Sequence, residues 1–309
     1  MMNLEGVLTA MVTPFTQDDT VDYDGFSKNV EYQLSQGVMG ILVCGTTGEA
    51  AVLTEQEKMA LTEQCAQINA GRIALLAGIA GDTTAQSIRL AKNAERCKAD
   101  ALLVTLPTSI KCNWEMMLKH FSSIGDATGL PLVLYNNCYV GNTDITVEQM
   151  ATLIDTIPNA RYIKECSYNS VQRIRDIRRR CGDSVQFVGG WDDHVLESYF
   201  VGATAWTSIC ANTVPKLCIK LHQSAMAQDW DAAWEVYNAI LPYIEYLFGD
   251  SSTMIGNLKY ANELLGLAGG VNRNPRIDLN NDQKARVSRE LKVLADHQGR
   301  LKAEAVNPR

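Results

Sequence analysis

Histidine is scarce in this sequence, and the cysteines do not occur as closely spaced pairs. The 309 residues include four histidines, none in an H-E-x-x-H pattern, which gives little support for a histidine-zinc hydrolase. The nine cysteines are odd in number and never stand as C-x-x-C, which argues against a disulfide framework or a zinc cluster. We therefore expect a reducing cytoplasmic environment, and any catalysis has to rest on groups other than a bound metal.

Long apolar runs and an excess of positive charge are also missing. No stretch approaches the roughly 18 uninterrupted apolar residues of a membrane span. The formal net charge is -7 and no basic run occurs, so the sequence predicts neither nucleic acid nor an anionic membrane as a partner. No Lys or Arg precedes Lys28, so the first residues do not resemble a signal peptide.

The sequence does contain enough apolar residues for a large core, arranged as short apolar runs that alternate with amphipathic stretches of helical length. The apolar runs predict strands at Gly6–Val12, Gly40–Cys44, Ile73–Ala77, Ala101–Thr105, Pro131–Tyr135, Ala160–Lys164, Val185–Val188 and Ala203–Thr207. The stretches between and after them predict helices at Asp24–Gln36, Thr54–Asn69, Thr84–Lys98, Trp114–Asp126, Val147–Asp155, Ser170–Arg180, His194–Val201, Pro215–Ala227, Trp230–Phe248, Thr253–Leu265 and Asn281–Ala295.

Strands separated by helices pair in parallel, and eight such units in a row most simply close into a (β/α)8 TIM barrel. An open doubly wound sheet is the competing fold, but no G-x-G-x-x-G loop follows the first strand. Strands end near residue 207, so we predict a catalytic barrel over residues 1–226 and an all-helical C-terminal extension over residues 227–309.

Active sites of parallel barrels lie where the strands end, and three endings carry polar groups. The second strand runs into Gly45, Thr46, Thr47, Gly48 and Glu49, a segment whose hydroxyls and backbone amides suit a bound carboxylate. The fifth strand ends at Tyr135, followed by Asn136 and Asn137, and the sixth ends at Lys164. A further loop, beginning at Gly189 and Gly190, follows the seventh strand and is expected to lie over the site.

A lysine at the end of an apolar strand is unusual, because burial of an ammonium group is costly and lowers its pKa. A neutral lysine can attack the carbonyl of a 2-oxo acid and form a Schiff base, and Tyr135 on the neighbouring strand could relay the protons. The alternative is that Lys164 reaches the rim of the barrel and pairs with Glu165. The residues alone leave both interpretations open. In the seventh loop, Asp193 is expected to cap the next helix.

These motifs, in this order and spacing over nearly the whole chain, resemble those of the dihydrodipicolinate synthase and N-acetylneuraminate lyase family. The resemblance implies a class I aldolase-type lyase that acts on pyruvate or a longer 2-oxo acid, without a cofactor, and assembles as a homotetramer. By position, Lys164 resembles the Schiff-base lysine, Tyr135 the proton-relay tyrosine and Thr46 the hydroxyl of that relay. The amides of Thr46 and Thr47, beside Gly45, would bind the carboxylate.

The sequence departs from the synthase pattern at two places. Pro107 is followed by Thr108 and Ser109 instead of a tyrosine pair, and Val140 stands where synthases carry an arginine for the second substrate's carboxylate. Losing that cation weakens recognition of an anionic substrate, so we expect weak dihydrodipicolinate synthesis. Asn136 and Asn137 would instead offer amide groups to a hydroxylated or cyclic neutral tail.

The reaction that the imine serves stays open at this point. The candidates are cleavage, condensation or dehydration of a 2-oxo acid, deamination of a cyclic imine derived from hydroxyproline, and a barrel that binds a 2-oxo acid without catalysis. Retention of the lysine, tyrosine and threonine of the relay argues against the last of these.

Overall fold

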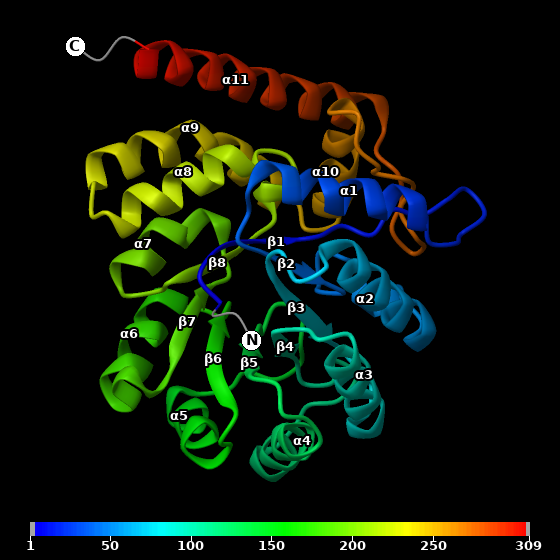
Figure 1. Ribbon diagram of the computed structural model, residues 1–309, viewed down its shortest axis with the longest axis vertical. Helices are drawn as coiled ribbons and strands as arrows, with labels where there is room; N and C mark the ends of the chain where they lie inside the picture. Colours follow the sequence, from blue (N-terminus) through cyan, green and yellow to red (C-terminus); the bar gives the residue numbers. More distant parts are fainter. Residues whose placement is uncertain (1–3, 307–309) are drawn as a thin grey trace.

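The computed structural model of the protein describes the backbone of residues 4–306 and side chains up to residue 294. Eight parallel strands form a closed barrel in which β8 pairs with β1, and the helices surround it (Figure 1). The strands are β1 (Gly6–Ala10), β2 (Gly40–Val43), β3 (Ala74–Ile79), β4 (Ala101–Val104), β5 (Leu132–Asn136), β6 (Ala160–Glu165), β7 (Gln186–Gly189) and β8 (Ala205–Ser208).

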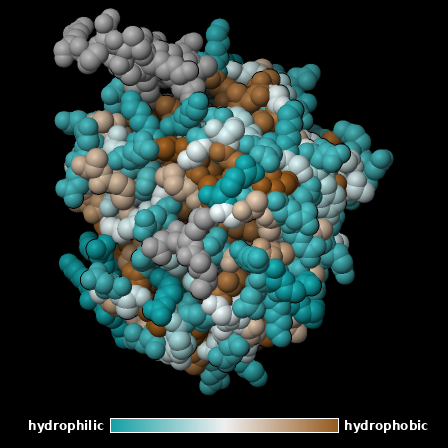
Figure 2. Space-filling view, in the orientation of Figure 1, coloured by the Kyte–Doolittle hydropathy of each residue, from teal (hydrophilic) through white to brown (hydrophobic). Residues whose placement is uncertain are grey.

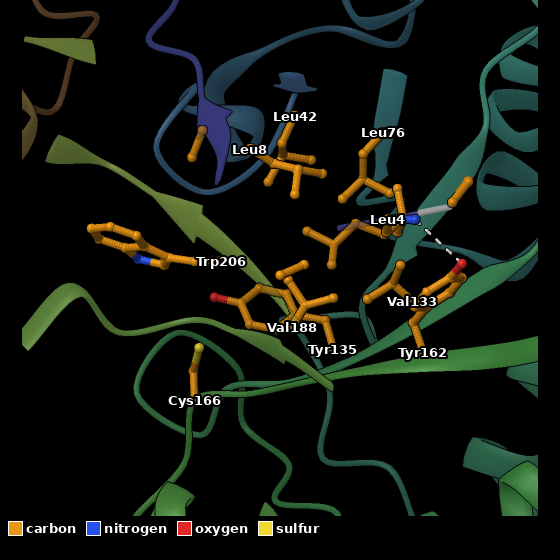
Figure 3. Close-up of a cluster of buried hydrophobic side chains, with 14 of the residues drawn as sticks. Leu4, Leu8, Leu42, Leu76, Val133, Tyr135, Tyr162, Cys166, Val188 and Trp206 are labelled. Atoms are coloured by element: carbon orange, nitrogen blue, oxygen red, sulfur yellow. Dashed lines mark hydrogen bonds between the residues drawn. The ribbon is translucent and has the colours of Figure 1, made fainter. Parts of the chain in front are cut away.

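The strands are apolar nearly throughout because one face packs inside the barrel and the other packs under the helices. Every residue of β2, β3 and β4 is buried. Leu8, Leu42 and Leu76, from three neighbouring strands, converge inside the barrel (Figure 3). At the other end of this core, the Tyr162 hydroxyl accepts a hydrogen bond from the Leu4 amide, at 3.4 Å. The barrel interior is thus a packed core, and substrate chemistry is confined to its rim.

The helices follow the strands as the sequence predicts. They are α1 (Tyr23–Gln36), α2 (Glu55–Asn69), α3 (Thr84–Arg96), α4 (Trp114–Asp126), α5 (Val147–Thr156), α6 (Ser170–Cys181), α7 (Val195–Phe200), α8 (Pro215–Met226), α9 (Trp230–Phe248), α10 (Met254–Leu264) and α11 (Asn281–Val306). Thr54 and Glu57 form the capping box that begins α2, with both reciprocal hydrogen bonds present. The outer surface of these helices is mainly hydrophilic, and hydrophobic residues show toward the middle of the face in Figure 2.

The predicted fold class, a (β/α)8 TIM barrel with a C-terminal helical extension, is confirmed. All eight strands and all the predicted helices are present among the described residues, with ends that differ by one or two residues in most cases. The helix after β7 is shorter than expected: α7 spans Val195–Phe200, because a 3-10 turn over Asp192–His194 precedes it. The predicted boundary at residue 226, between the barrel and the C-terminal extension, stays a prediction. Helix α9, on the extension side of this boundary, packs closely on α8, on the barrel side.

Buried ion pairs attach the C-terminal extension to the loops at the barrel mouth. Lys259 of α10 pairs with Glu49, which follows β2, and both side chains are at most 2% exposed. Lys259 also donates to the backbone oxygen of Val271 at 2.9 Å and lies over the Phe15 ring. Arg273 contacts Glu57 of α2 at 2.8 Å. The extension therefore supports the segment that follows β2.

Candidate active site

Lys164 and Tyr135 lie side by side at the inner end of a cavity of about 800 Å³. The two residues are register partners on the adjacent strands β5 and β6. The Lys164 Nζ atom lies 4.2 Å from the centre of the Tyr135 ring, and the two side chains are 7% and 6% exposed. Cys166, two residues beyond the lysine, lines the same cavity. The sequence-based expectation that the lysine and the tyrosine meet at the barrel mouth agrees with this geometry.

Glu165 is not a partner of Lys164, because successive residues of a strand point to opposite faces. The Glu165 carboxylate accepts from the amide nitrogen of Asn136 at 3.1 and 3.2 Å and from the Ser167 amide at 2.8 Å. The alternative interpretation of Lys164 as a rim lysine paired with Glu165 is therefore wrong. Asn136 is likewise directed away from the cavity, where it also donates to Asp144 and to the Ile145 backbone oxygen. The expectation that Asn136 contacts substrate does not fit this position.

Of the two asparagines expected near the substrate tail, Asn137 lines the cavity and Asn136 does not. Asn137 also donates to the Tyr135 hydroxyl at 2.7 Å. The same alternation explains this: residues 133, 135 and 137 share one face, and Val133 and Tyr135 both point into the barrel in Figure 3. The period of two was the signal that could have separated Asn137 from Asn136 in the sequence.

The segment after β2 brings Thr46 and Thr47 to the cavity wall. A tight turn forms here, with Glu49 in the left-handed region at φ 57° and its amide donating to the Thr46 oxygen at 3.1 Å. Within the described part of the chain, the amides of Thr46 and Thr47 have no hydrogen-bond acceptor. Two free amides at the polar end of a cavity suit a carboxylate. Gly45 is not among the lining residues, so its predicted contact with substrate does not fit the structure.

Gly190, rather than Gly189, approaches the lysine. A methyl group added at Gly190 would lie 2.1 Å from the Cys166 sulfur and 2.8 Å from the Lys164 Cε. Only glycine permits this close approach of backbone to side chains. Gly189 is the last residue of β7 and does not line the cavity, and a methyl group there would meet no atom closer than 3.5 Å. The predicted glycine contact therefore belongs one residue later.

Burial acts on the ionisable groups around the lysine in opposing ways. Burial alone lowers the pKa of Lys164, but the Tyr135 oxygen, the Cys166 sulfur and the Asp192 carboxylate raise it, and the net pKa is above the ordinary value. Burial raises the pKa of Tyr135 and, to about 12, that of Cys166. The direction is opposite to the expected fall of the lysine pKa, because the acidic neighbours oppose the effect of desolvation. An ammonium group at Lys164 has to lose a proton before the amine can attack a carbonyl.

Asp192 lies in the loop after β7 and connects this loop to the end of β8 and the residues that follow it. It is fully buried and accepts from the Ser208 hydroxyl at 2.7 Å and from the Ile209 and Cys210 amides at 3.2 Å each. Burial raises the pKa of Asp192 to about 6, although these hydrogen bonds oppose the shift. Asp192 thus holds the end of β7 against the segment after β8.

The outer part of the cavity combines Trp191, from the loop expected over the site, with two residues that the sequence analysis did not assign to the site. Trp191 comes from the loop after β7, whereas Phe248 and Met254 belong to α9 and α10 of the C-terminal extension. No motif near these two residues indicated a role, because they reach the mouth only when the extension packs on the barrel. Asp193 also lines the cavity and makes no side-chain cap to α7, so its predicted capping role is wrong.

The chain as a whole is similar to known proteins. The model of the "Dihydrodipicolinate synthetase family" matches residues 3–294. The chain belongs to this family. A 4-hydroxy-tetrahydrodipicolinate synthase of Bartonella henselae is 32% identical over 288 residues, which cover 93% of this chain and 97% of that protein. A synthase of the same name from Gluconacetobacter diazotrophicus is 32% identical over 93% of this chain and 96% of its own length.

Solved structures of family members superpose closely on this barrel. The 4-hydroxy-tetrahydrodipicolinate synthase of Methylacidiphilum fumariolicum has a TM-score of 0.91 at 26% identity, covering 97% of this chain and 99% of that one. The dihydrodipicolinate synthase of Acinetobacter baumannii, solved in complex with pyruvate, has a TM-score of 0.89 at 28% identity, covering 95% and 99%. The resemblance drawn from the motifs is thus confirmed, and the chain is a divergent, lyase-type member of the dihydrodipicolinate synthetase family.

Among the described residues, no group of three or more His, Cys, Asp or Glu side chains is arranged to hold a metal ion. No helix in the same part of the chain is both long and apolar enough to cross a membrane.

Proposed function

We propose that this chain is a class I aldolase-type lyase in which Lys164 forms a Schiff base with pyruvate or a longer 2-oxo acid. The observation that carries the proposal is the buried amine of Lys164 beside the Tyr135 ring, at the inner end of a cavity with two free amides. The amides of Thr46 and Thr47 would bind the carboxylate and so present the adjacent keto carbon to the amine.

Imine formation needs three proton movements, and the surroundings of Tyr135 suit them. The lysine ammonium first gives up a proton, and its amine then attacks the keto carbon. The nitrogen next loses a proton and the former keto oxygen gains one, which gives the carbinolamine. The carbinolamine hydroxyl leaves as water once it is protonated, which gives the iminium ion. Tyr135 stays protonated at neutral pH because burial raises its pKa, and its oxygen is hydrogen-bonded by Asn137 and the Thr46 side chain. We assign Tyr135 as the group that moves the proton between amine and carbinolamine, with Thr46 as its partner.

The test is reduction with borohydride in the presence of pyruvate, followed by intact-mass measurement. We expect a covalent pyruvate adduct on the wild-type chain and none on Lys164→Ala, with exposed Lys28→Ala as the matched control. An adduct that persists in Lys164→Ala, or no adduct on the wild type, would refute the proposal.

The comparisons do not support deamination of a cyclic imine or a barrel that binds without catalysis, since the relatives named above are synthases. Dihydrodipicolinate synthesis by this chain is still expected to be weak. Val140, where an arginine would bind the second carboxylate, lies at the cavity wall with half of its side chain exposed. Neither Thr108 nor Ser109 is among the residues that line the cavity.

We also propose a cytoplasmic homotetramer. All nine cysteines are free thiols, which suits a reducing compartment. Exposed apolar side chains such as Ile277, 77% exposed, are available for contacts between subunits. Light scattering at micromolar concentration tests the assembly, and a monomeric mass would contradict it.

A further inference from the structure

The cavity above Lys164 is much larger than pyruvate, and its two ends differ in chemistry. The inner end carries Lys164, Thr46 and Thr47, whereas the outer end combines the rings of Tyr139 and Trp191 with acidic side chains. A volume of about 800 Å³ lies within the range of sites that enclose ligands of many atoms. The outer end therefore has room for the group that is joined to, or released from, the pyruvate unit.

Three aromatic rings form a continuous wall at the outer end. Tyr139, after β5, meets Trp191, after β7, edge to face, with ring centres 5.5 Å apart and an interplanar angle of 89°. Trp191 in turn contacts Phe248 at the end of α9, with centres 5.3 Å apart at 63°. All three rings line the cavity. Such a wall offers flat apolar surfaces and ring edges to a planar apolar group.

The charges at this end are negative. Asp193 and Glu197 line the cavity near the aromatic wall. Lys164, at the opposite end, is the single Lys or Arg among the described residues that line it. Arg173, on the nearby helix α6, is engaged with Asp144 and the Ile145 backbone oxygen. His194 lines the cavity too, with its Nε2 atom 4.0 Å from the Asp193 carboxylate. An anionic group at the outer end would face two carboxylates with no Lys or Arg of the described lining beside it, which disfavours its binding.

We infer that the bond-forming partner of the pyruvate imine is an aldehyde with an uncharged aromatic ring, held by Tyr139, Trp191 and Phe248. This inference rests on the proposed function. Loss of a methyl proton converts the imine of pyruvate into an enamine, whose terminal carbon attacks the aldehyde carbon. A carbon-carbon bond forms, the aldehyde oxygen takes up a proton, and water releases a 4-hydroxy-2-oxo acid from the lysine. The reverse sequence cleaves the same acid into pyruvate and the aromatic aldehyde.

A series of aldehydes of similar shape tests the inference on the full chain. Pyruvate is supplied with benzaldehyde, methyl 4-formylbenzoate or 4-carboxybenzaldehyde, and separately with aspartate semialdehyde, and the 4-hydroxy-2-oxo acid or cyclised product is quantified by mass. We expect kcat/KM for the two neutral aldehydes to exceed that for 4-carboxybenzaldehyde by at least about tenfold, because the carboxylate of the latter would face Asp193 and Glu197. The double variant Asp193→Asn/Glu197→Gln should narrow this ratio, because the repulsion is removed.

The aromatic wall is tested separately. Trp191→Ala should raise KM for benzaldehyde, whereas Trp234→Ala, which removes a 56% exposed tryptophan of α9 outside the cavity, should not. Borohydride trapping of pyruvate is measured on every variant. Absence of trapping in the wild type contradicts the proposed function itself. Normal trapping with no turnover of any neutral aromatic aldehyde, or with equal or faster turnover of the anionic aldehydes, overturns this inference alone.

Discussion

The ion pair between Lys259 and Glu49 is the contact through which the C-terminal extension is expected to support the catalytic rim. The perturbation is Lys259→Met, which keeps the length of the side chain and removes its charge. Glu49 is then left as a carboxylate with a 1% exposed side chain and only Arg276, at 3.7 Å, nearby. Removal of one partner of a buried pair typically costs about 3–5 kcal/mol, since the other charge stays desolvated.

The expected shift in melting temperature follows from the chain length. At about 2.1 cal/mol/K per residue, unfolding of 309 residues has an entropy of roughly 0.65 kcal/mol/K. A loss of about 3–5 kcal/mol therefore lowers Tm by roughly 5–8 °C, measured by differential scanning calorimetry at a fixed protein concentration. Lys292→Met, an exposed lysine on α11, is the matched control and should change stability by less than about 0.5 kcal/mol.

A double variant tests whether the unpaired charge of Glu49 causes the loss of stability in Lys259→Met. Glu49→Gln/Lys259→Met leaves no ionised group in the pair, so it should be more stable than Lys259→Met alone. Pyruvate trapping should weaken in Lys259→Met, because Glu49 follows Thr47 by two residues in the turn that is expected to bind the carboxylate. A double variant no more stable than the single one, or a Tm shift below about 1 °C, would refute this reasoning.

Three further predictions concern the rim of the barrel. Tyr135→Phe should slow borohydride trapping of pyruvate by about 10²- to 10⁴-fold, because the proton relay is removed while the ring is kept, and unchanged trapping kinetics would point to another relay group. Gly190→Ala should reduce trapping by about 100-fold, since the new methyl group displaces the lysine, whereas Gly189→Ala should not, and equal effects would contradict the assigned contact. Asp192 has a pKa of about 6 when folded against about 3.9 unfolded, so the folded state holds its proton more tightly. Its contribution to stability is therefore present below about pH 4 and lost as the pH rises through 6, in total about 3 kcal/mol. The unfolding free energy of the wild type minus that of Asp192→Asn, measured with urea, should therefore fall as the pH rises. A difference that does not change with pH would argue against the raised pKa of Asp192.

The fold was predictable from the sequence because its signal is local and repeated eight times. Each short apolar run, such as Gly40–Val43, is buried on both faces, and each is followed by a stretch with helical periodicity. The capping box at Thr54 and Glu57 was readable for the same reason, since a cap involves residues three positions apart. The meeting of Lys164 and Tyr135 followed from topology, because strands that are consecutive in a parallel barrel are neighbours.

The sequence analysis did not place every site residue correctly, because the site also depends on side-chain direction and on contacts between distant segments. Asn136 and Asn137 were both expected at the site, but the pleat brings only Asn137 there. Gly189 was expected to contact substrate, whereas the path of the loop brings Gly190 to the cavity.

Sequence by itself therefore determined the barrel, its element order and the strand ends that carry polar groups, because these arise from local periodicity and parallel pairing. Only the tertiary structure decided the direction of the Lys164 pKa, since that direction depends on acidic groups brought close by other strands. It also decided that Phe248, from the extension, joins Trp191 at the cavity wall, 57 positions away along the chain. Contacts of this kind leave no periodic pattern in the sequence, because they form only when the whole chain is packed.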